Sequence, residues 1–167
     1  FLNKYGLTKE TALCNFIPNS YEVYWNISPE NFNDKMHEES NKFWNDDRIK
    51  KTKNINLTKT QVISLAAIVQ KETAKIEERA KVAGVYINRI KVGMLLQADP
   101  TVIYSKKLLD NNFDQQINRV LYKDLKLDSP YNTYKYLGIP PGPIAMPDIS
   151  SIDAVLNYEH HNYYYFV

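Results

Sequence analysis

The stretch TKTQVISLAAIVQKETA, residues 58–74, carries the clearest structural signal in this chain of 167 residues. Thr58 stands three residues before Gln61, the spacing of a capping box, in which two side chains satisfy each other's backbone N–H groups at a helix start. Apolar side chains then recur at helical spacing and form one stripe, made by Val62, Leu65, Ala66 and Val69. The stretch therefore predicts a helix from residue 58 to about residue 74.

A second helix is predicted over residues 77–91. Three side chains are expected on its inner face: Val82, Val85 and Tyr86. Gly93 follows it, as is common where a helix ends in a left-handed residue, and Lys91 complements the dipole of the last turn. Together the two helices form a predicted helical core over residues 58–91.

Weaker patterns predict the remaining elements, and they are of several kinds. Two helices are expected over residues 29–49 and 150–156. A third is expected to begin at Asp99, with Asp99 as N-cap and Pro100 in the first turn. Short strands are expected at residues 21–24, 94–97 and 163–167. A polar connector is expected at 45–57, a loop with a short helix at 106–129, and a proline-rich loop at 130–147. The predicted fold class is α+β, a helical core with short β-strands beside it.

The length suits a single domain that covers residues 1–167, with residues 1–57 including part of a small N-terminal subdomain. Because the chain lacks an initiator Met and ends on an apolar segment, we expect a fragment of a longer protein. No apolar run approaches the roughly 20 residues that span a bilayer.

Composition excludes some function classes. A net charge of +2 gives no electrostatic reason to expect nucleic-acid binding. The single cysteine, Cys14, cannot form an internal disulfide and is expected to be a buried, inert thiol. His160 and His161 are adjacent, so their side chains diverge and metal chelation is not expected. No glycine-rich phosphate loop occurs either.

Glu72 is the residue that points most clearly to chemistry. It lies seven residues after Leu65 and four after Ile68, so a helix places its carboxyl at the edge of the apolar stripe. A carboxyl held against apolar neighbours loses solvation, so its pKa rises and it can donate a proton near neutral pH. Spacing alone leaves open a solvated Glu72, or an ion pair with Arg79 or Arg89.

Seven separated segments resemble, in the same order, the endolytic murein transglycosylases of the YceG-like family. They are FIPNSYEV (16–23), LAAIVQKET (65–73), ERAKVAGVYINR (78–89), GMLLQADPTVIY (93–104), SPYNTY (129–134), GIPPGPI (138–144) and YYYFV (163–167). The resemblance is weakest at residues 30–57 and 106–128. Several motifs in order are far more specific than one short pattern.

The resemblance implies an endolytic lytic transglycosylase. Such an enzyme cleaves the bond between N-acetylmuramic acid and N-acetylglucosamine in peptidoglycan and leaves 1,6-anhydro ends, which limits the length of new strands. It implies Glu72 as the one catalytic acid and base, no metal and no cofactor. Family members often carry a second Glu at the position of Gln70. Because an amide cannot act as the acid, this difference leaves Glu72 and excludes Gln70. The catalytic cleft is expected at the end of the Glu72 helix, beside the loops at 97–101 and 131–143.

Substrate contacts are expected from Arg89, Gln97, Asp99, Thr101, Tyr131, Asn132 and Thr133. Several of these residues have a structural alternative. Asp99 is either a second carboxylate or a helix cap, and Arg89 orients Glu72, binds substrate or forms a structural ion pair. Gln97 bonds an acetamido group or caps a strand, Asn132 touches sugar or holds a turn, and Tyr134 stacks on sugar or packs inside.

Two other functions remain open at this point: a non-catalytic glycan-binding or scaffold module, and a hydrolytic muramidase that uses Glu72 with Asp99. The resemblance implies peptidoglycan glycan strands as substrate and peptidoglycan synthases as partners, with no nucleic acid. It also implies a location at the cell membrane. A single-pass anchor outside this fragment would hold the catalytic region on the extracytoplasmic side.

Overall fold

The computed structural model describes residues 1–166, and all regular structure within them is helical. Its α-helices are α1 (Pro29–Phe43), α2 (Asp46–Asn54), α3 (Lys59–Glu72), α4 (Arg79–Val92), α5 (Asp99–Leu109) and α6 (Ile149–Leu156). Short 3-10 helices are η1 (Leu2–Tyr5), η2 (Ala12–Asn15), η3 (Ile76–Glu78) and η4 (Tyr122–Lys126). Residues 130–147 form no helix, as their prolines predict.

The predicted α+β class is wrong, because no strand forms in the part of the chain that the structure describes. Residues 21–24 are mostly exposed, and the one backbone bond in this segment is a turn bond, from the Ile27 N–H to the Tyr24 carbonyl at 3.0 Å. Residues 94–97 make one backbone bond to a distant segment, from the Gln97 N–H to the Thr133 carbonyl at 3.2 Å, whereas a strand needs a ladder of such bonds. Residues 163–166 form no strand either, and Val167 lies outside the described residues.

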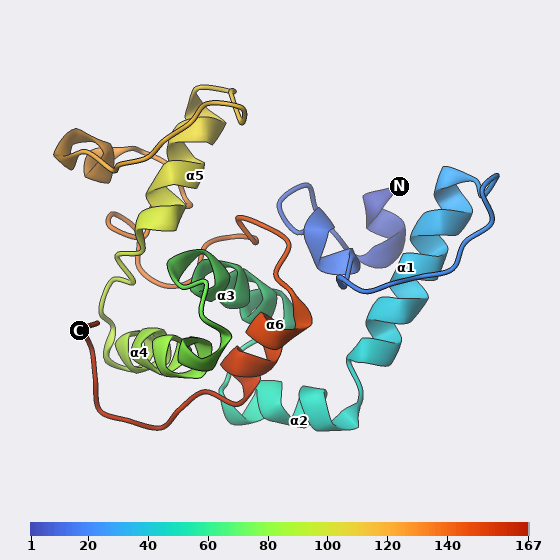
Figure 1. Ribbon diagram of the computed structural model, residues 1–167, viewed down its shortest axis with the longest axis horizontal. Helices are drawn as coiled ribbons and strands as arrows, with labels where there is room; N and C mark the ends of the chain where they lie inside the picture. The colour runs from blue at the N-terminus through green and yellow to red at the C-terminus, as the bar shows by residue number, and fades with distance from the viewer. Residues whose placement is uncertain (167) are drawn as a thin grey trace.

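The core is built around α3, which packs against α4, α5 and α6 (Figure 1). Residues 62–69 are all buried, so α3 is apolar on every side and is a central helix. The predicted capping box is present: the Gln61 N–H donates to the Thr58 hydroxyl at 3.2 Å, and the Thr58 N–H donates to the Gln61 amide oxygen at 2.9 Å. The predicted helical core over residues 58–91 is thereby confirmed.

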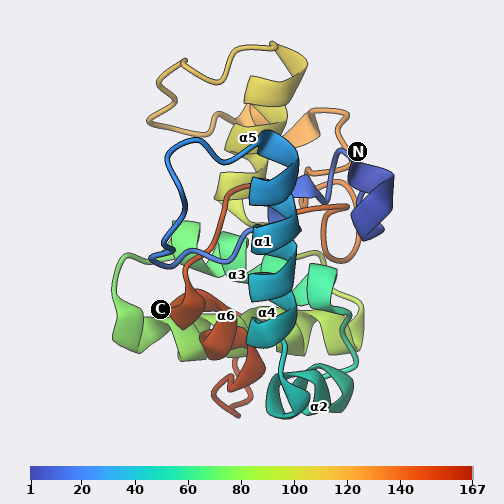
Figure 2. The ribbon, with the colours of Figure 1, turned by 90° about the vertical axis from the view of Figure 1, so that its right-hand side faces the viewer.

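The helix predicted over residues 29–49 is instead two helices that meet at an angle (Figure 2). α1 ends at Phe43, Trp44 turns into the core, and the Asn45 side chain caps α2 by accepting the Arg48 N–H at 3.0 Å. The predicted polar connector is therefore wrong for most of its length. α2 is polar but has aspartates in its first turn and lysines in its last, both of which favour a helix.

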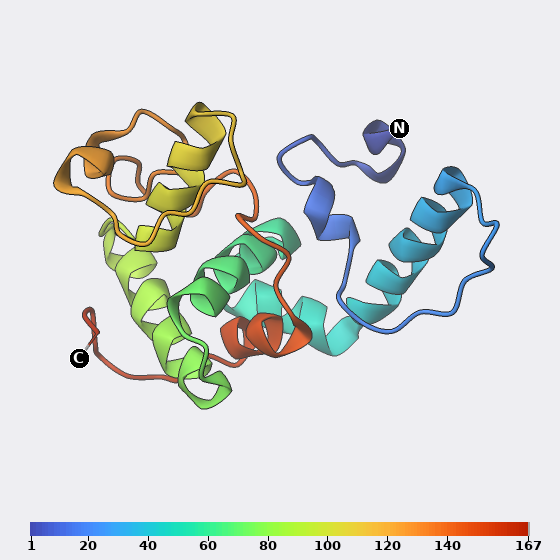
Figure 3. The ribbon, with the colours of Figure 1, turned by 45° about the horizontal axis from the view of Figure 1, so that its top comes forward.

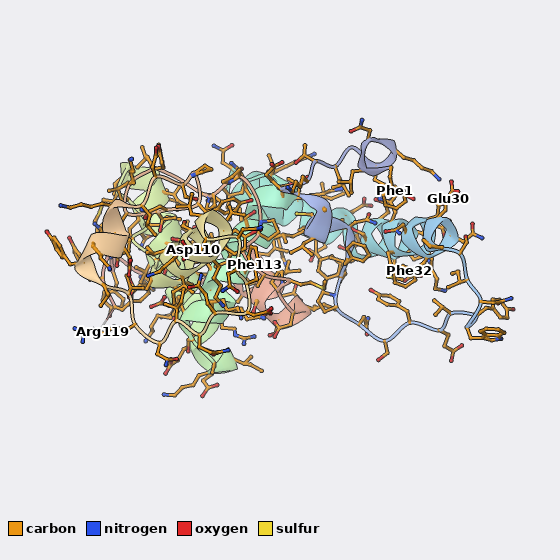
Figure 4. The ribbon with its side chains drawn as sticks, turned by 90° about the horizontal axis from the view of Figure 1, so that it is seen from above. Phe1, Glu30, Phe32, Asp110, Phe113 and Arg119 are labelled. Carbon is orange, nitrogen blue, oxygen red and sulfur yellow. The ribbon has the colours of Figure 1, made fainter. Side chains whose placement is uncertain are left out.

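The N-terminal part of the chain forms an arm beside this core (Figure 3). Seen from above, Glu30 and Phe32 lie near one end of the molecule and Arg119 near the other (Figure 4). The arm is not a separate unit, because Cys14 and Trp44 belong to the same buried cluster as α3. Burial raises the pKa of Cys14 to about 11, so its thiol stays protonated at neutral pH.

The chain after α6 runs closely along α4. Gly84 permits this approach, because a Cβ there would lie 2.4 Å from the carbonyl oxygen of Glu159. The Asn88 amide then donates to the carbonyls of His161 and Tyr163, at 2.8 and 3.0 Å. These contacts bring residues 163–166 to the end of α3, where they share a cavity with Glu72.

Candidate active site

Glu72 is the last residue of α3, and the chain turns sharply after it. Thr73 leaves the helix in an extended conformation, with φ −137° and ψ 133°. The Thr73 hydroxyl donates to Glu78 at 3.1 Å and accepts the Lys75 N–H at 3.2 Å. This short turn leads through η3 into α4, so the side chains of α4 pass close to Glu72.

Glu72 lines a cavity of about 450 Å³. The other walls come from the turn after α3, from α4 and from the end of the chain: Thr73, Glu78, Lys81, Val82, Val85, Tyr163, Tyr165 and Phe166. The predicted loops at 97–101 and 131–143 do not line it, although Asp99 and Tyr134 lie close to Glu72 at its edge. A cavity of this volume suits a small ligand or part of a larger one.

The pKa of Glu72 is raised above that of an ordinary carboxyl. Burial is the largest cause, because the cavity walls displace water from the carboxyl even though part of the side chain stays exposed. The negative charge of Asp99 raises it further, while the nearby Tyr86 hydroxyl and the charge of Arg89 oppose the rise. Glu72 is thereby biased towards its protonated form, which a general acid requires.

Tyr86, which belongs to α4, lies close to Glu72 and is fully buried. Its ring packs edge-on against Phe166, with 5.3 Å between ring centroids. Its hydroxyl has no partner of good geometry among residues 1–166. A buried hydroxyl without a partner costs about 1–3 kcal/mol, and this one lies close enough to Glu72 to favour its ionised form. The sequence placed Tyr86 on the inner face of its helix but did not identify it as a neighbour of Glu72.

Asp99 does not cap α5, and the predicted N-cap is wrong. Ala98 holds that position, and Asp99 is the first helical residue, followed by Pro100. The Asp99 carboxylate instead accepts a hydrogen bond from the Tyr134 hydroxyl at 2.5 Å. Burial, followed by this bond, raises the pKa of Tyr134 above its ordinary value. Asp99 is therefore an exposed carboxylate, oriented by a tyrosine and near Glu72.

Arg89 is buried, and its side chain connects two segments near the site, the one that contains Leu96 and the one that contains Tyr164. Its Nε donates to the Tyr164 carbonyl and its Nη1 to the Leu96 carbonyl, each at 2.6 Å. The guanidinium also lies over the rings of Tyr165 and Phe166, at 5.3 and 5.9 Å from their centroids. Within residues 1–166 it forms no ion pair with a carboxylate, so it acts on Glu72 through its charge and through the segments that it holds.

Besides Arg89, four of the expected substrate contacts are buried: Thr101, Tyr131, Asn132 and Thr133. The Thr133 hydroxyl accepts the Ala98 N–H at 2.9 Å and lies 2.8 Å from the Thr101 hydroxyl. The Asn132 amide donates to the Leu125 and Leu127 carbonyls, at 3.0 and 2.8 Å. In this structure the four residues hold the loop that carries Tyr134 against α5, and direct contact with substrate remains a prediction.

Two glutamines near the site differ in role. Gln97 is exposed, and its backbone has a left-handed conformation with φ 50°, which is unusual for a residue that is neither Gly nor Asn. Such strain just before Asp99 is typical of positions that a functional site constrains. Gln70 is a structural residue here, because its amide oxygen accepts the Asp148 N–H at 2.7 Å and the Ser151 hydroxyl at 3.1 Å. It thus joins α3 to the start of α6.

Comparison with known proteins is consistent with this geometry. A protein of Bacillus subtilis (strain 168) named endolytic murein transglycosylase is 42% identical over 107 residues, which are 64% of this chain and 28% of the relative. A protein of that name from Streptococcus pneumoniae (strain D39) is 36% identical over 115 residues, 69% of this chain and 20% of the relative. The chain thus matches less than a third of the length of these relatives.

A crystal structure of a putative yceG-like protein from Listeria monocytogenes has a similar fold. The TM-score is 0.72 with 30% sequence identity, and the match covers 89% of this chain and 46% of that one. Residues 3–167 match the sequence model of the YceG-like family. The chain therefore belongs to the YceG-like family, as its motifs indicated.

Proposed function

We propose that this chain is the catalytic domain of an endolytic lytic transglycosylase that cleaves peptidoglycan glycan strands. The observation that carries the proposal is Glu72: a carboxyl with a raised pKa, in a cavity at the end of a buried helix. The relatives named endolytic murein transglycosylase support the choice of substrate and reaction. A binding module would have no use for a carboxyl whose pKa is raised in this way.

The reaction needs one group that first gives and then takes a proton. Protonated Glu72 donates to the oxygen that joins N-acetylmuramic acid to N-acetylglucosamine, and the bond from that oxygen to C1 of the muramoyl sugar breaks. The Glu72 carboxylate then accepts the proton of the C6 hydroxyl, whose oxygen attacks C1 and forms the 1,6-anhydro ring. The attacking hydroxyl belongs to the substrate, so no water, metal or cofactor is consumed, and positioning supplies much of the rate.

Asp99 favours a second candidate, a hydrolytic muramidase. Glycosidases that use water have two carboxyl groups, one protonated and one ionised. Glu72 is biased towards the protonated form, and Asp99 is close enough for its negative charge to raise the pKa of Glu72. An Asp99 carboxylate in that place could activate a water molecule. The two candidates share Glu72 as the acid and differ in the nucleophile.

The first prediction concerns the products. Peptidoglycan strands incubated with the protein are expected to yield 1,6-anhydromuramoyl ends, which mass spectrometry separates from reducing ends by the mass of one water. Anhydro ends would establish the lytic reaction. Reducing ends, converted to anhydro ends or lost in Asp99→Asn, would establish the muramidase. Intact strands that nevertheless bind the protein would leave only the non-catalytic module.

The second prediction concerns pH. Because Glu72 acts as an acid, kcat/KM is expected to fall as pH rises through the raised pKa of Glu72. Asp99→Asn removes a negative charge, so it lowers that pKa and moves the fall to lower pH. Tyr86→Phe removes a hydroxyl that stabilises the nearby carboxylate, so it raises the pKa of Glu72 and moves the fall to higher pH. A profile that shifts in the same direction in both variants would exclude Glu72 as the titrating group.

The remaining inferences concern the whole protein. We infer one catalytic domain, since Cys14, Ile17 and Trp44 from the first 57 residues share the buried cluster of α3. We also infer that the domain works outside the cytoplasmic membrane, near the peptidoglycan synthases whose product it would cut. Within residues 1–166, no helix has the length and apolar character needed to cross a bilayer. The proposed single-pass anchor would belong to another part of the protein.

A further inference from the structure

A second cavity, of about 350 Å³, lies beside the Glu72 site. Its walls are apolar and aromatic with two lysines: Lys71, Pro100, Ile103, Tyr104, Lys107, Phe113, Ile144 and Ala145. The two cavities share no lining residue, but residues that are consecutive in the chain connect their surroundings at two places. Lys71 lines the second cavity and the next residue, Glu72, lines the first, while Pro100 of the second cavity follows Asp99, whose charge acts on Glu72.

The charges of this second cavity differ from those of the Glu72 site. The Glu72 cavity contains two carboxyl groups and one lysine, whereas no carboxyl group lines the second cavity. Neither Lys71 nor Lys107 forms an ion pair within residues 1–166. One carboxylate, Glu10, lies near Tyr104 and contributes, after burial, to raising the pKa of that tyrosine, but it is not part of the wall. The second cavity therefore suits an anion that also has apolar parts.

Its aromatic wall is well ordered by packing. Tyr104 on α5 contacts Phe113 in the following loop and Tyr131 in the loop below, with ring centroids 5.7 and 4.7 Å apart. Tyr131 is buried, so Tyr104 has a fixed support, while half of the Phe113 side chain remains exposed. Methyl groups and peptide planes can pack on such a surface, with a carboxylate directed towards the two ammonium groups.

The proposed substrate has a group of this kind next to the bond that is cut. A muramoyl sugar bears a lactyl group on O3, to which a short peptide with free carboxylates is attached. Since the enzyme would break the bond at C1 of that same sugar, the peptide must leave the glycan within one sugar ring of Glu72. A protein surface that holds this peptide would therefore have to lie near the Glu72 site.

We propose that the cavity between Lys71, Lys107 and Phe113 holds the acidic stem peptide of the muramoyl sugar at the cleavage position. The inference rests on the proposed function and adds a preference to it: strands that carry peptides are better substrates than strands without them. Lys71 and Lys107 bind the peptide carboxylate, and Tyr104 and Phe113 contact its apolar groups. Glu72 keeps its role in bond cleavage.

Activity gives the first test. Glycan strands with uncrosslinked peptides are compared with the same strands after an amidase has removed the peptides. Wild-type protein is expected to show about fivefold higher kcat/KM on the peptide-bearing strands, the size expected for two partly exposed ion pairs. In Lys71→Gln/Lys107→Gln this ratio is expected to fall towards one, mainly through KM. Lys53→Gln, an exposed lysine on α2, is the matched control and should keep the wild-type ratio.

Binding gives a second test that does not depend on catalysis. The probe is N-acetylmuramoyl-L-alanyl-D-glutamate, with its amidated, less charged form as the control ligand. The acid form is expected to shift the NMR signals of Phe113 and Ile144 in wild-type protein, and the shifts should weaken with the amidated ligand and in the double variant. Shifts without any cleavage of strands would support the peptide site and refute the proposed function. Cleavage with an unchanged ratio and no shifts would overturn the peptide site alone.

Discussion

Glu72→Gln is expected to reduce cleavage of peptidoglycan strands by about 10³-fold or more, because it removes the only proposed proton donor and acceptor. Gln has nearly the shape of a protonated Glu, so substrate binding should persist. The measurement is the rate of appearance of new muramoyl ends, together with sedimentation of the protein on strands. Loss of cleavage with retained binding is the expected pair of results.

Stability provides the control for this variant. The pKa of Glu72 is raised in the folded state, so its favourable contribution is present at low pH and is lost as pH rises through that pKa. At neutral pH the uncharged Gln should therefore be at least as stable as Glu. A lower Tm in Glu72→Gln would mean that lost folding, and not lost chemistry, explains inactivity.

Glu78→Gln is a matched comparison, since Glu78 lines the same cavity. Hydrogen bonds from Lys75 and Thr73 lower the pKa of Glu78, so that carboxyl stays ionised and cannot donate a proton at neutral pH. Its replacement is expected to lower the rate by less than about tenfold, because it removes a contact in the cavity wall and leaves the acid in place. Equal losses in the two variants would mean that the wrong carboxyl has been assigned.

The central helices could be predicted from sequence because their signals are local. The capping box at Thr58 and the glycine after α4 act within a few residues of the helix ends that they determine. The prediction of strands was wrong for the opposite reason, because a strand is stabilised by hydrogen bonds to the backbone of a neighbouring strand. Residues 94–97 and 163–166 have the apolar character of strands, but the side chain of Arg89 bonds carbonyls of both segments. That arrangement leaves no visible pattern in the sequence.

The site shows the same division. Helical spacing and family motifs led to Glu72 without any knowledge of its neighbours. The proximity of Tyr86 and Asp99 to Glu72 depends on how α4 and α5 pack against α3, and the positions in sequence do not reveal it. Thr101 and Asn132 illustrate the reverse case. Their motifs are recognisable, but in the structure both side chains are buried and support a loop.

Arg89→Met is expected to lower the free energy of unfolding by about 3 kcal/mol, which corresponds to a fall in Tm of roughly 10 °C for a chain of this size. Met retains most of the packing volume but donates no hydrogen bond. Leu96 is fully buried, so its carbonyl is left without a partner, and the Tyr164 carbonyl loses a bond to a charged group. Removing a buried charge offsets part of this cost. Thermal unfolding of both proteins gives the comparison.

The same variant should change the active site without touching the acid. Residues 163–166 lose the brace that holds them over α4, so their amide hydrogens should exchange faster while those of α3 stay protected. Loss of the positive charge also raises the pKa of Glu72, which moves the high-pH fall in kcat/KM upward. Lys91→Met, two residues further along α4, removes a bond to the Tyr158 hydroxyl and a contact with the ring of the same residue, and should lower stability by less than about 1 kcal/mol. If the two variants unfold at the same temperature, Arg89 is not the brace that positions the walls around Glu72.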